Sequence, residues 1–344
     1  MASVKSRKSE PALTRAFSYQ MGVRIEGTPV VCDAPRTAGA LAFISHAAVV
    51  SARVGKSRPI TAAQVLLTQM CANLLEAAGH PLGSRGLVAA YGRPFAMGML
   101  RVELFPSGVA PGSASLMCEG PQGRVVFAGP VGLGTPGGHT QAAEIRPAEA
   151  LCLDATYASR STPFAPVAAT FDQVLEFVEE ALALGQQPVL RTGVDPLTLD
   201  LGRALHTAGF GVRAHARLIK LAEIHKAAGL PAVPWRPFSG GLGAKEVVLF
   251  PASTKPTAAL EKLKAAKVAI TAPLTPLEMT AEATYLPLSN TASGPELLSY
   301  AKATGAKEVA TLNDHVGAFA MQLRKQGLQA YALGAPAQMP LFAR

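Results

Sequence analysis

Short apolar runs, separated by glycine, proline and polar residues, dominate the first part of the chain. Runs of this length and spacing are typical of β-strands. They predict strands at 30–32, 42–44, 102–105, 116–118 and 125–128. Between them, apolar residues from Val65 to Leu75 recur with a helical spacing and Gly79 follows, so the pattern predicts a helix over 61–78.

After a further strand at 151–153, the pattern changes to strands that alternate with helices. Apolar residues from Phe171 to Leu182 recur with a helical spacing. Asp195-Pro196 is typical of the N-cap and first position of another helix. The strands predicted in this part lie at 189–190, 247–250 and 268–270.

The C-terminal part contains the clearest helix signal. Ser293 and Glu296 form a capping-box sequence, and Gly305 is placed to end the helix. A strand at 309–312, a helix at 316–326 and a strand at 330–333 are predicted after it. The whole pattern predicts an α/β protein built as a layered sandwich with an insert.

Composition excludes several protein classes. Of the 344 residues 49% are hydrophobic and 16% are charged, so the chain can bury a sizeable core and is not intrinsically disordered.

The four cysteines are far apart and form no zinc-ribbon spacing, which predicts buried apolar roles in a reducing, cytoplasmic compartment. The chain starts without an apolar signal-peptide core, and its most apolar stretch, 38–52, is too short to span a bilayer. We therefore expect no membrane partner.

The formal net charge of +9 fits a polyanionic partner, although a basic surface without a partner is an equal alternative. Residues 1–19 are predicted to be a basic, flexible tail. The candidate nucleic-acid-binding residues, which lie in this tail and at 53–58, are Lys5, Arg7, Lys8, Arg53, Lys56 and Arg58.

Several motifs in order carry a family resemblance. Val30-Val31-Cys32-Asp33 places an acid at the end of a predicted strand, and the next strand runs into His46. Two further motifs, Gly112-Ser113-Ala114 and Asp154-Ala155-Thr156-Tyr157, follow later in the chain. From about residue 22 to 333, the chain resembles the metallo-β-lactamase-fold nucleases of the β-CASP group. The nearest likeness is to bacterial ligase-associated exonucleases and RNA 3′-end-processing factors.

The resemblance fails at the metal-binding positions. The family has His-x-His-x-Asp-His after this strand, whereas here the sequence is His46-Ala47-Ala48-Val49-Val50-Ser51. The family's other metal ligands align with Val109, Pro130 and Asn313, and Ser289-Asn290 replaces its Ser-Asp pair. Ala48, Val50, Val109 and Pro130 have no side-chain donor atom, and a neutral serine such as Ser51 is a poor one. The remnant of the site would comprise Asp33, His46, Asp154, Ser289, Asn290 and Asn313.

The resemblance implies a metallo-β-lactamase αββα sandwich formed by 20–158 and 272–344, with a β-CASP-like α/β insert at 159–271. It also implies a catalytically inactive pseudo-nuclease, a nucleic-acid-binding or scaffold protein for DNA repair or RNA processing. The expected partners are DNA or RNA together with an active nuclease homologue, a ligase or a helicase, and a homodimer stays open. No cofactor is expected.

Two alternatives stay open. One is a metal-dependent exonuclease or other hydrolase with an atypical site, which would use zinc or manganese. The other is a structural interaction protein without nucleic-acid contact. Trp235, within Pro234-Trp235-Arg236-Pro237-Phe238, is a candidate partner-binding residue if its loop is exposed, or a core residue if it is packed.

Overall fold

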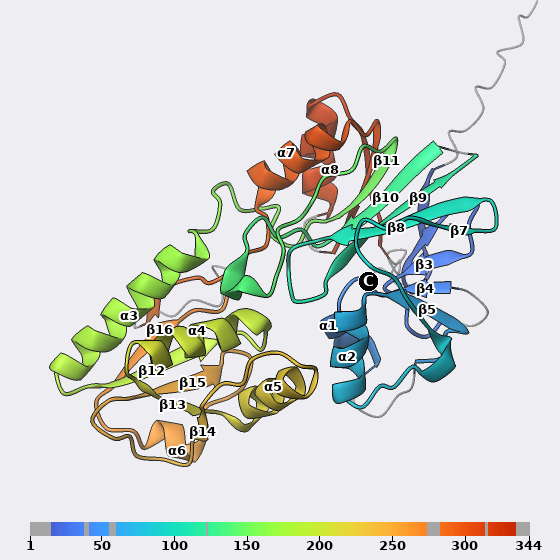
Figure 1. Cartoon of the computed structure of the whole chain (residues 1–344). Helices are drawn as coiled ribbons and strands as arrows, with labels where there is room; N and C mark the ends of the chain where they lie inside the picture. The colour runs from blue at the N-terminus through green and yellow to red at the C-terminus, as the bar shows by residue number, and fades with distance from the viewer. Residues whose placement is uncertain are drawn as a thin grey trace, which may run out of the picture.

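The computed structural model describes residues 15–37, 41–54, 60–121, 123–273, 283–313 and 316–334, and for 51–54 and 136 it describes the backbone alone. Two sheets and their helices form one unit, and a third sheet with its own helices is inserted into it (Figure 1). The protein is of the α/β class, as predicted.

The first sheet has six strands in chain order. These are β1 (Phe17–Tyr19), β2 (Val23–Ile25), β3 (Val30–Cys32), β4 (Leu41–Phe43), β5 (Gln64–Leu67) and β6 (Gly86–Val88). Strands β3 to β6 are parallel, and β1 and β2 are added antiparallel at one edge.

The second sheet has seven strands, which pair in parallel from β19 to β10 and antiparallel from β10 to β7. Its spatial order is β19 (Gln329–Ala332), β18 (Glu308–Leu312), β11 (Ala150–Asp154), β10 (Gly123–Gly129), β9 (Ala114–Gly120), β8 (Leu100–Pro106) and β7 (Phe95–Met97). Strands β11 and β18 pair although the whole insert separates them in the sequence.

The two sheets pack face to face, and alternate residues of their strands point into the space between them. Phe43 and Leu66 of the first sheet share a buried cluster with Leu104 and Phe127 of the second. The rings of Phe43 and Phe127 meet edge to face, with their centroids 6.0 Å apart. This contact lies between the two sheets and forms the centre of the sandwich.

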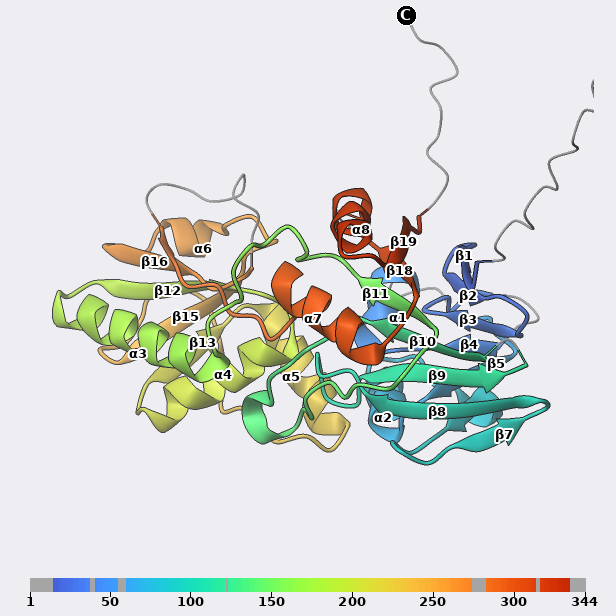
Figure 2. The ribbon, with the colours of Figure 1, turned by 90° about the horizontal axis from the view of Figure 1, so that it is seen from above.

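Helices cover both outer faces of the sandwich (Figure 2). Helices α1 (Ala47–Val54) and α2 (Gln69–Ala77) pack on the first sheet, in a cluster that includes Val65 and Leu67. Helices α7 (Gly294–Thr304) and α8 (Val316–Lys325) pack on the second. The layers are therefore helix, sheet, sheet and helix.

The third sheet is entirely parallel and lies between β11 and α7 in the sequence. Its order is β14 (Arg236–Pro237), β13 (Gly211–Ala214), β15 (Glu246–Pro251), β12 (Gln187–Thr192), β16 (Ala266–Ile270) and β17 (Thr284–Tyr285). Helices α3 (Val167–Ala183), α4 (Pro196–Thr207) and α5 (Ala216–Ala227) pack on one face, and α6 (Ala258–Glu261) packs on the other. Helix α5 also contacts α2 of the sandwich.

The structure corrects the helix predicted over 61–78. Residues Gln64–Leu67 are strand β5, and the helix begins only after Thr68, whose hydroxyl accepts the Cys71 N–H as an N-cap. Strand β5 is covered on both faces, so its run of apolar residues lacks the alternation that distinguishes a strand from a helix.

Three further differences concern boundaries and missed elements. Phe17 is buried in strand β1, so residues 17–19 belong to the first sheet rather than to the predicted tail. Strand β17 joins the third sheet, and Leu288 packs in its core, so the insert extends beyond the predicted boundary at 271. Helix α5 and strand β13 were not predicted from the sequence.

The described elements confirm the predicted capping box and the predicted burial of cysteine. The Glu296 carboxylate accepts the Ser293 N–H at 2.8 Å, and Gly305 ends α7 with a φ of 70°. All four cysteines are free and buried. Trp235 is packed against the core of the third sheet, which is the second of the two roles considered for it.

Replacing Phe43 by alanine is expected to destabilise the protein by about 3–5 kcal/mol, because it removes a fully buried ring and leaves a cavity between the sheets. Denaturant unfolding followed by circular dichroism measures this loss. Met99→Ala, at an 84% exposed position, is the control and should change stability by less than about 0.5 kcal/mol. Equal effects of the two variants would contradict the proposed centre of the sandwich.

Candidate functional site

Asp33 follows strand β3 and adopts a left-handed backbone conformation with a φ of 53°. One carboxylate oxygen accepts the Ser45 N–H at 2.8 Å, and the other accepts the Ser45 hydroxyl at 2.8 Å. Ser45 is fully buried, and Asp33 is nearly so. A non-glycine residue in this conformation costs about 1–3 kcal/mol, which the surrounding hydrogen bonds must offset.

His46 extends this network by one residue. Its Nδ1 lies 2.9 Å from the Ser45 hydroxyl oxygen. Because the single hydroxyl hydrogen of Ser45 is donated to Asp33, Nδ1 must donate to Ser45 and Nε2 is left as an acceptor. Burial lowers the pKa of His46, while the negative charges of Asp33 and Asp154 act in the opposite direction. We infer a neutral imidazole whose orientation is set by Ser45.

Asp154, at the end of strand β11, is also held by neighbouring donors. One of its oxygens accepts both the backbone N–H and the hydroxyl of Thr156. The other accepts the Asn313 side-chain N–H at 2.6 Å, and Asn313 itself has a φ of 66°. Asp33, Asp154 and Asn313 line one cavity of about 220 Å³. The structure therefore brings these three sequence-predicted residues together.

Ser289 and Asn290 act locally. The Ser289 hydroxyl accepts the Thr291 N–H at 3.1 Å, and the Asn290 side chain donates to Gly108 O at 2.6 Å. The first bond stays within the segment before α7, and the second fixes this segment against the loop after β8. Both residues therefore have structural roles near the site.

The residues that align with the family's metal ligands lie in different surroundings. Ala48, Val109 and Pro130 line a second cavity together with His46, and Pro130 also lines the first. Val50 is fully buried in the cluster beneath α1 and α2. The side chain of Ser51 lies outside the described residues.

These residues do not fit a pair of catalytic metal ions. Zinc and manganese sites need several imidazole, thiolate or carboxylate donors converging on each ion. The cavity residues that align with the family's metal ligands, Ala48, Val109 and Pro130, are aliphatic, and the carboxylates of Asp33 and Asp154 accept hydrogen bonds from protein donors. Within the part of the chain that the structure describes, no group of three or more His, Cys, Asp or Glu residues is arranged to hold a metal ion.

The second cavity has a volume of about 450 Å³ and lies between the sandwich and the insert. We call it the interunit cavity. Leu74 and Ala78, at the C-terminal end of α2, form one wall together with the residues that follow β4, and α5 forms the opposite wall. The loops that carry Pro111 and Pro130 lie between these walls.

Helix α5 contributes one continuous stripe to this cavity. Its members are Arg217, Lys220, Leu221, Ile224 and His225. Their spacing of three and four residues places them on one helix face, because an α-helix has 3.6 residues per turn. Arg217 and Lys220 are exposed, whereas His225 is buried. The stripe thus runs from cationic at one end to apolar and buried at the other.

His225 has an unusual hydrogen-bonding state. Its Nδ1 lies 2.9 Å from Leu221 O, and because a carbonyl only accepts, Nδ1 must be the donor. Its Nε2 is buried and has no hydrogen-bond partner. The residue is 6% exposed, and burial lowers its pKa, so the ring is neutral and Nε2 is an acceptor.

Sequence reasoning missed the α5 stripe. Helix α5 itself was not predicted. The spacing of Arg217, Leu221 and His225 was the available signal, because residues four positions apart share one face of a helix.

The side chains of the six candidate nucleic-acid-binding residues lie outside the described part of the chain. Lys5, Arg7, Lys8, Lys56 and Arg58 lie outside the described residues, as does the side chain of Arg53, whose backbone belongs to α1. They stay predictions.

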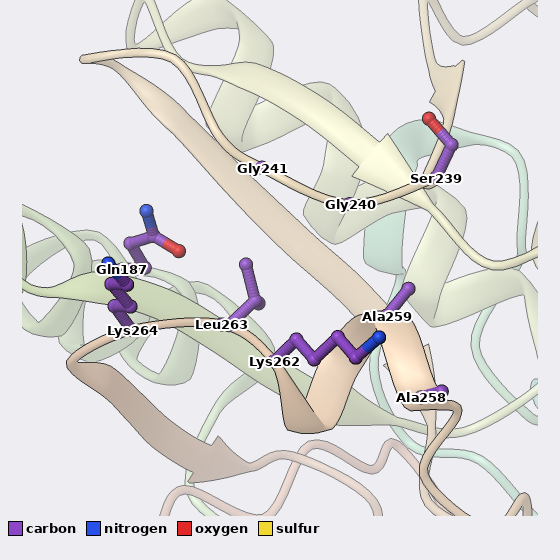
Figure 3. A pocket seen from close by; sticks show the side chains of 9 residues that line it. All are labelled: Gln187, Ser239, Gly240, Gly241, Ala258, Ala259, Lys262, Leu263 and Lys264. Carbon is purple, nitrogen blue, oxygen red and sulfur yellow. The ribbon is translucent and has the colours of Figure 1, made fainter.

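A third cavity, of about 510 Å³, lies on the insert near α6 and contains none of the predicted site residues. It is lined by Gln187, the Ser239-Gly240-Gly241 loop and a segment that includes Lys262 and Lys264 (Figure 3). The amino groups of these two lysines lie at opposite sides of the cavity and do not converge on one ligand (Figure 3).

No protein-family model matches the sequence. The chain is 27% identical over 251 residues to a protein of Opitutus terrae named "Probable DNA ligase". The match covers 71% of this chain and 24% of that protein, so the chain spans about a quarter of the length of this relative. Among the described residues, no helix is long and apolar enough to cross a membrane.

Replacing Ser45 by alanine is expected to destabilise the protein by about 1–3 kcal/mol, because it removes the buried hydroxyl that bonds to both Asp33 and His46. Denaturant unfolding at neutral pH measures the effect. Ser299→Ala, which removes an exposed hydroxyl on α7, is the matched control and should cost less than about 0.5 kcal/mol. A Ser45→Ala protein as stable as the wild type would show that the network does not stabilise the fold.

Acidification is expected to destabilise the protein through His46 and His225. Their pKa values are lowered in the folded state, so the unfolded chain takes up protons first as the pH falls below about 6.5. The contribution of each histidine is complete above that pH. Below it, stability falls by up to about 1.4 kcal/mol per pH unit for each group until the folded-state pKa is reached.

The measurement is the free energy of unfolding at pH 7.5 and at pH 5. His225→Leu should lose less stability between these pH values than the wild type does. His206→Leu, at an exposed position of α4, should keep the wild-type dependence. The same pH dependence in all three proteins would contradict the neutral state assigned to His225.

Proposed function

We propose that this chain is a degenerate member of the metallo-β-lactamase-fold nucleases of the β-CASP group, which binds DNA without hydrolysing it and acts with a DNA-ligating partner. Its role would be that of a scaffold or regulatory protein in DNA repair. The four buried, free cysteines suit a reducing cytoplasm, which is the compartment we propose for it.

The arrangement of layers supports the family. A helix–sheet–sheet–helix sandwich with an α/β unit inserted between β11 and α7 is the architecture that the sequence resemblance implies. Asp33, His46, Asp154 and Asn313 also follow strands of the two facing sheets, as the aligned motifs require. The correspondence extends over both halves of the sandwich.

The observation that carries the non-hydrolytic role is the chemistry of the cavity walls. Metal-assisted hydrolysis needs ions that activate water and stabilise the reacting oxygens. Ala48, Val109 and Pro130 supply no donor for such ions, and their surfaces are apolar. The carboxylates that persist are bound to Ser45, Thr156 and Asn313 instead.

Two observations favour DNA as the polymer. The relative named "Probable DNA ligase" matches most of this chain, while most of its own length lies outside the match. The net charge of +9 suits a phosphate backbone, and Arg217 and Lys220 lie at the rim of the interunit cavity. We infer that the interunit cavity binds a DNA strand through its phosphate groups.

Binding of a fluorescently labelled single-stranded DNA, measured by anisotropy, is expected to weaken steeply with salt. The logarithm of the affinity should fall linearly with the logarithm of the salt concentration, with a slope of about −0.7 for each phosphate contact. The double variant Arg217→Ala/Lys220→Ala should reduce this slope by about 1.4, because two contacts are lost. Lys302→Ala, on α7, is the control and should keep the wild-type slope.

Incubation of labelled DNA with the protein in the presence of zinc or manganese tests the proposed absence of hydrolysis. No cleavage above a chelated control is expected. Chelator-sensitive cleavage that is lost in His46→Ala would overturn the non-hydrolytic role and favour a hydrolase with an atypical site. An absence of salt-dependent DNA binding would instead favour a structural protein without nucleic-acid contact.

A further inference from the structure

The interunit cavity presents apolar surface that no side chain of the protein covers. Its volume of about 450 Å³ lies within the range of ~300–1,000 Å³ that is usual for small-molecule sites. Most of its lining residues are aliphatic and come from both units, and those that are partly or fully exposed include Ala48, Val109, Pro130, Leu221 and Ile224. Apolar side chains that gather in one hollow and stay in contact with water are typical of a binding site.

The charged side chains at this cavity already have partners within the chain. Arg217 donates to the Thr254 hydroxyl at 3.0 Å, and Asp195 is held as the N-cap of α4. Lys220 is exposed and its amino group lies 3.9 Å from the Glu223 carboxylate. A charged ligand on the aliphatic walls would lose its hydration without gaining a counter-ion there, which is costly. The walls therefore favour a neutral ligand.

His46 adds one hydrogen-bond acceptor to the aliphatic walls. Because its Nδ1 donates to the Ser45 hydroxyl, Nε2 carries no hydrogen. His46 is partly exposed, and its Nε2 is not among the enclosed, unpaired side-chain atoms, whereas Nε2 of His225 is. A ligand in the cavity can therefore reach Nε2 of His46 but not that of His225. To pair with this acceptor, the ligand must carry an N–H or O–H donor.

We propose that the interunit cavity binds a neutral, largely apolar small molecule that carries one N–H or O–H donor. Its apolar body contacts Leu74 and Ile224 on the two opposite walls, and its donor pairs with Nε2 of His46. The few polar contacts and the large apolar area are the usual division of roles in such a site. The ligand uses the aliphatic walls rather than Arg217 and Lys220, to which the proposed function assigns DNA phosphates.

Ligand-observed NMR of the full chain with indole and benzofuran is the first test. The two probes have nearly the same shape, but indole carries one N–H donor and benzofuran has an ether oxygen in its place. We expect saturable binding of indole, about 3- to 10-fold tighter than that of benzofuran, because only indole forms the hydrogen bond to Nε2. Equal affinity for the two probes, or no binding of either, would overturn the proposal.

Two variants test the location. His46→Phe keeps a ring but removes the acceptor, so it should abolish the preference for indole over benzofuran. Ile224→Trp fills the cavity and should weaken binding of both probes at least 10-fold. The matched controls, at exposed positions outside the cavity, are His206→Phe and Leu184→Trp, which should bind as the wild type does. Circular dichroism establishes that each variant is folded. Wild-type affinity in folded Ile224→Trp, or a wild-type preference in folded His46→Phe, would overturn the proposal.

A second copy of the chain is the alternative occupant of the cavity. Light scattering after size-exclusion chromatography measures the oligomeric state, and a wild-type dimer that Ile224→Trp dissociates would place a second copy there and overturn the proposal. Salt-dependent DNA binding without indole binding would also overturn it and leave the proposed function intact. Indole binding without DNA binding would support the ligand site and contradict the proposed function.

Discussion

The parallel pairing of β11 with β18 is the constraint on which the rest of the structure depends. The two strands are matched from Ala150 opposite Glu308 to Asp154 opposite Leu312, with the whole insert between them in the sequence. The chain must therefore leave and re-enter the second sheet at neighbouring strands. Because side chains after parallel strands meet at one edge of a sheet, this pairing places Asp154 beside Asn313.

The same constraint positions the insert against the sandwich. The chain leaves β11, builds the third sheet and returns through α7, so α5 comes to lie against α2. A cavity between two such units is lined by both of them, and its polarity depends on residues that lie far apart in the sequence. His46 and Val109 come from the sandwich, whereas Ile224 and His225 come from the insert.

The carboxylates beside the cavity are bound by protein groups. A buried carboxylate without a partner is costly, so it must be bound by a metal or by protein donors. In this chain Ser45 supplies those donors to the buried Asp33, and Asn313 donates to Asp154, which is only partly buried. Ala48, Val109 and Pro130 make part of the wall of the neighbouring cavity apolar.

The sequence by itself determined the α/β class, the buried cysteines, the capping box at Ser293 and the absence of donor atoms at Ala48, Val109 and Pro130. These follow from local periodicity and from residue chemistry, which need no knowledge of distant contacts. Only the tertiary structure decided that 64–67 is a strand, because burial on both faces removes its alternation. It also decided that α5 lines the interunit cavity, because the stripe from Arg217 to His225 borders a cavity only where the sandwich packs against the insert. The physical reason is that burial and hydrogen-bond partners are set by contacts between distant segments, which residue spacing does not encode.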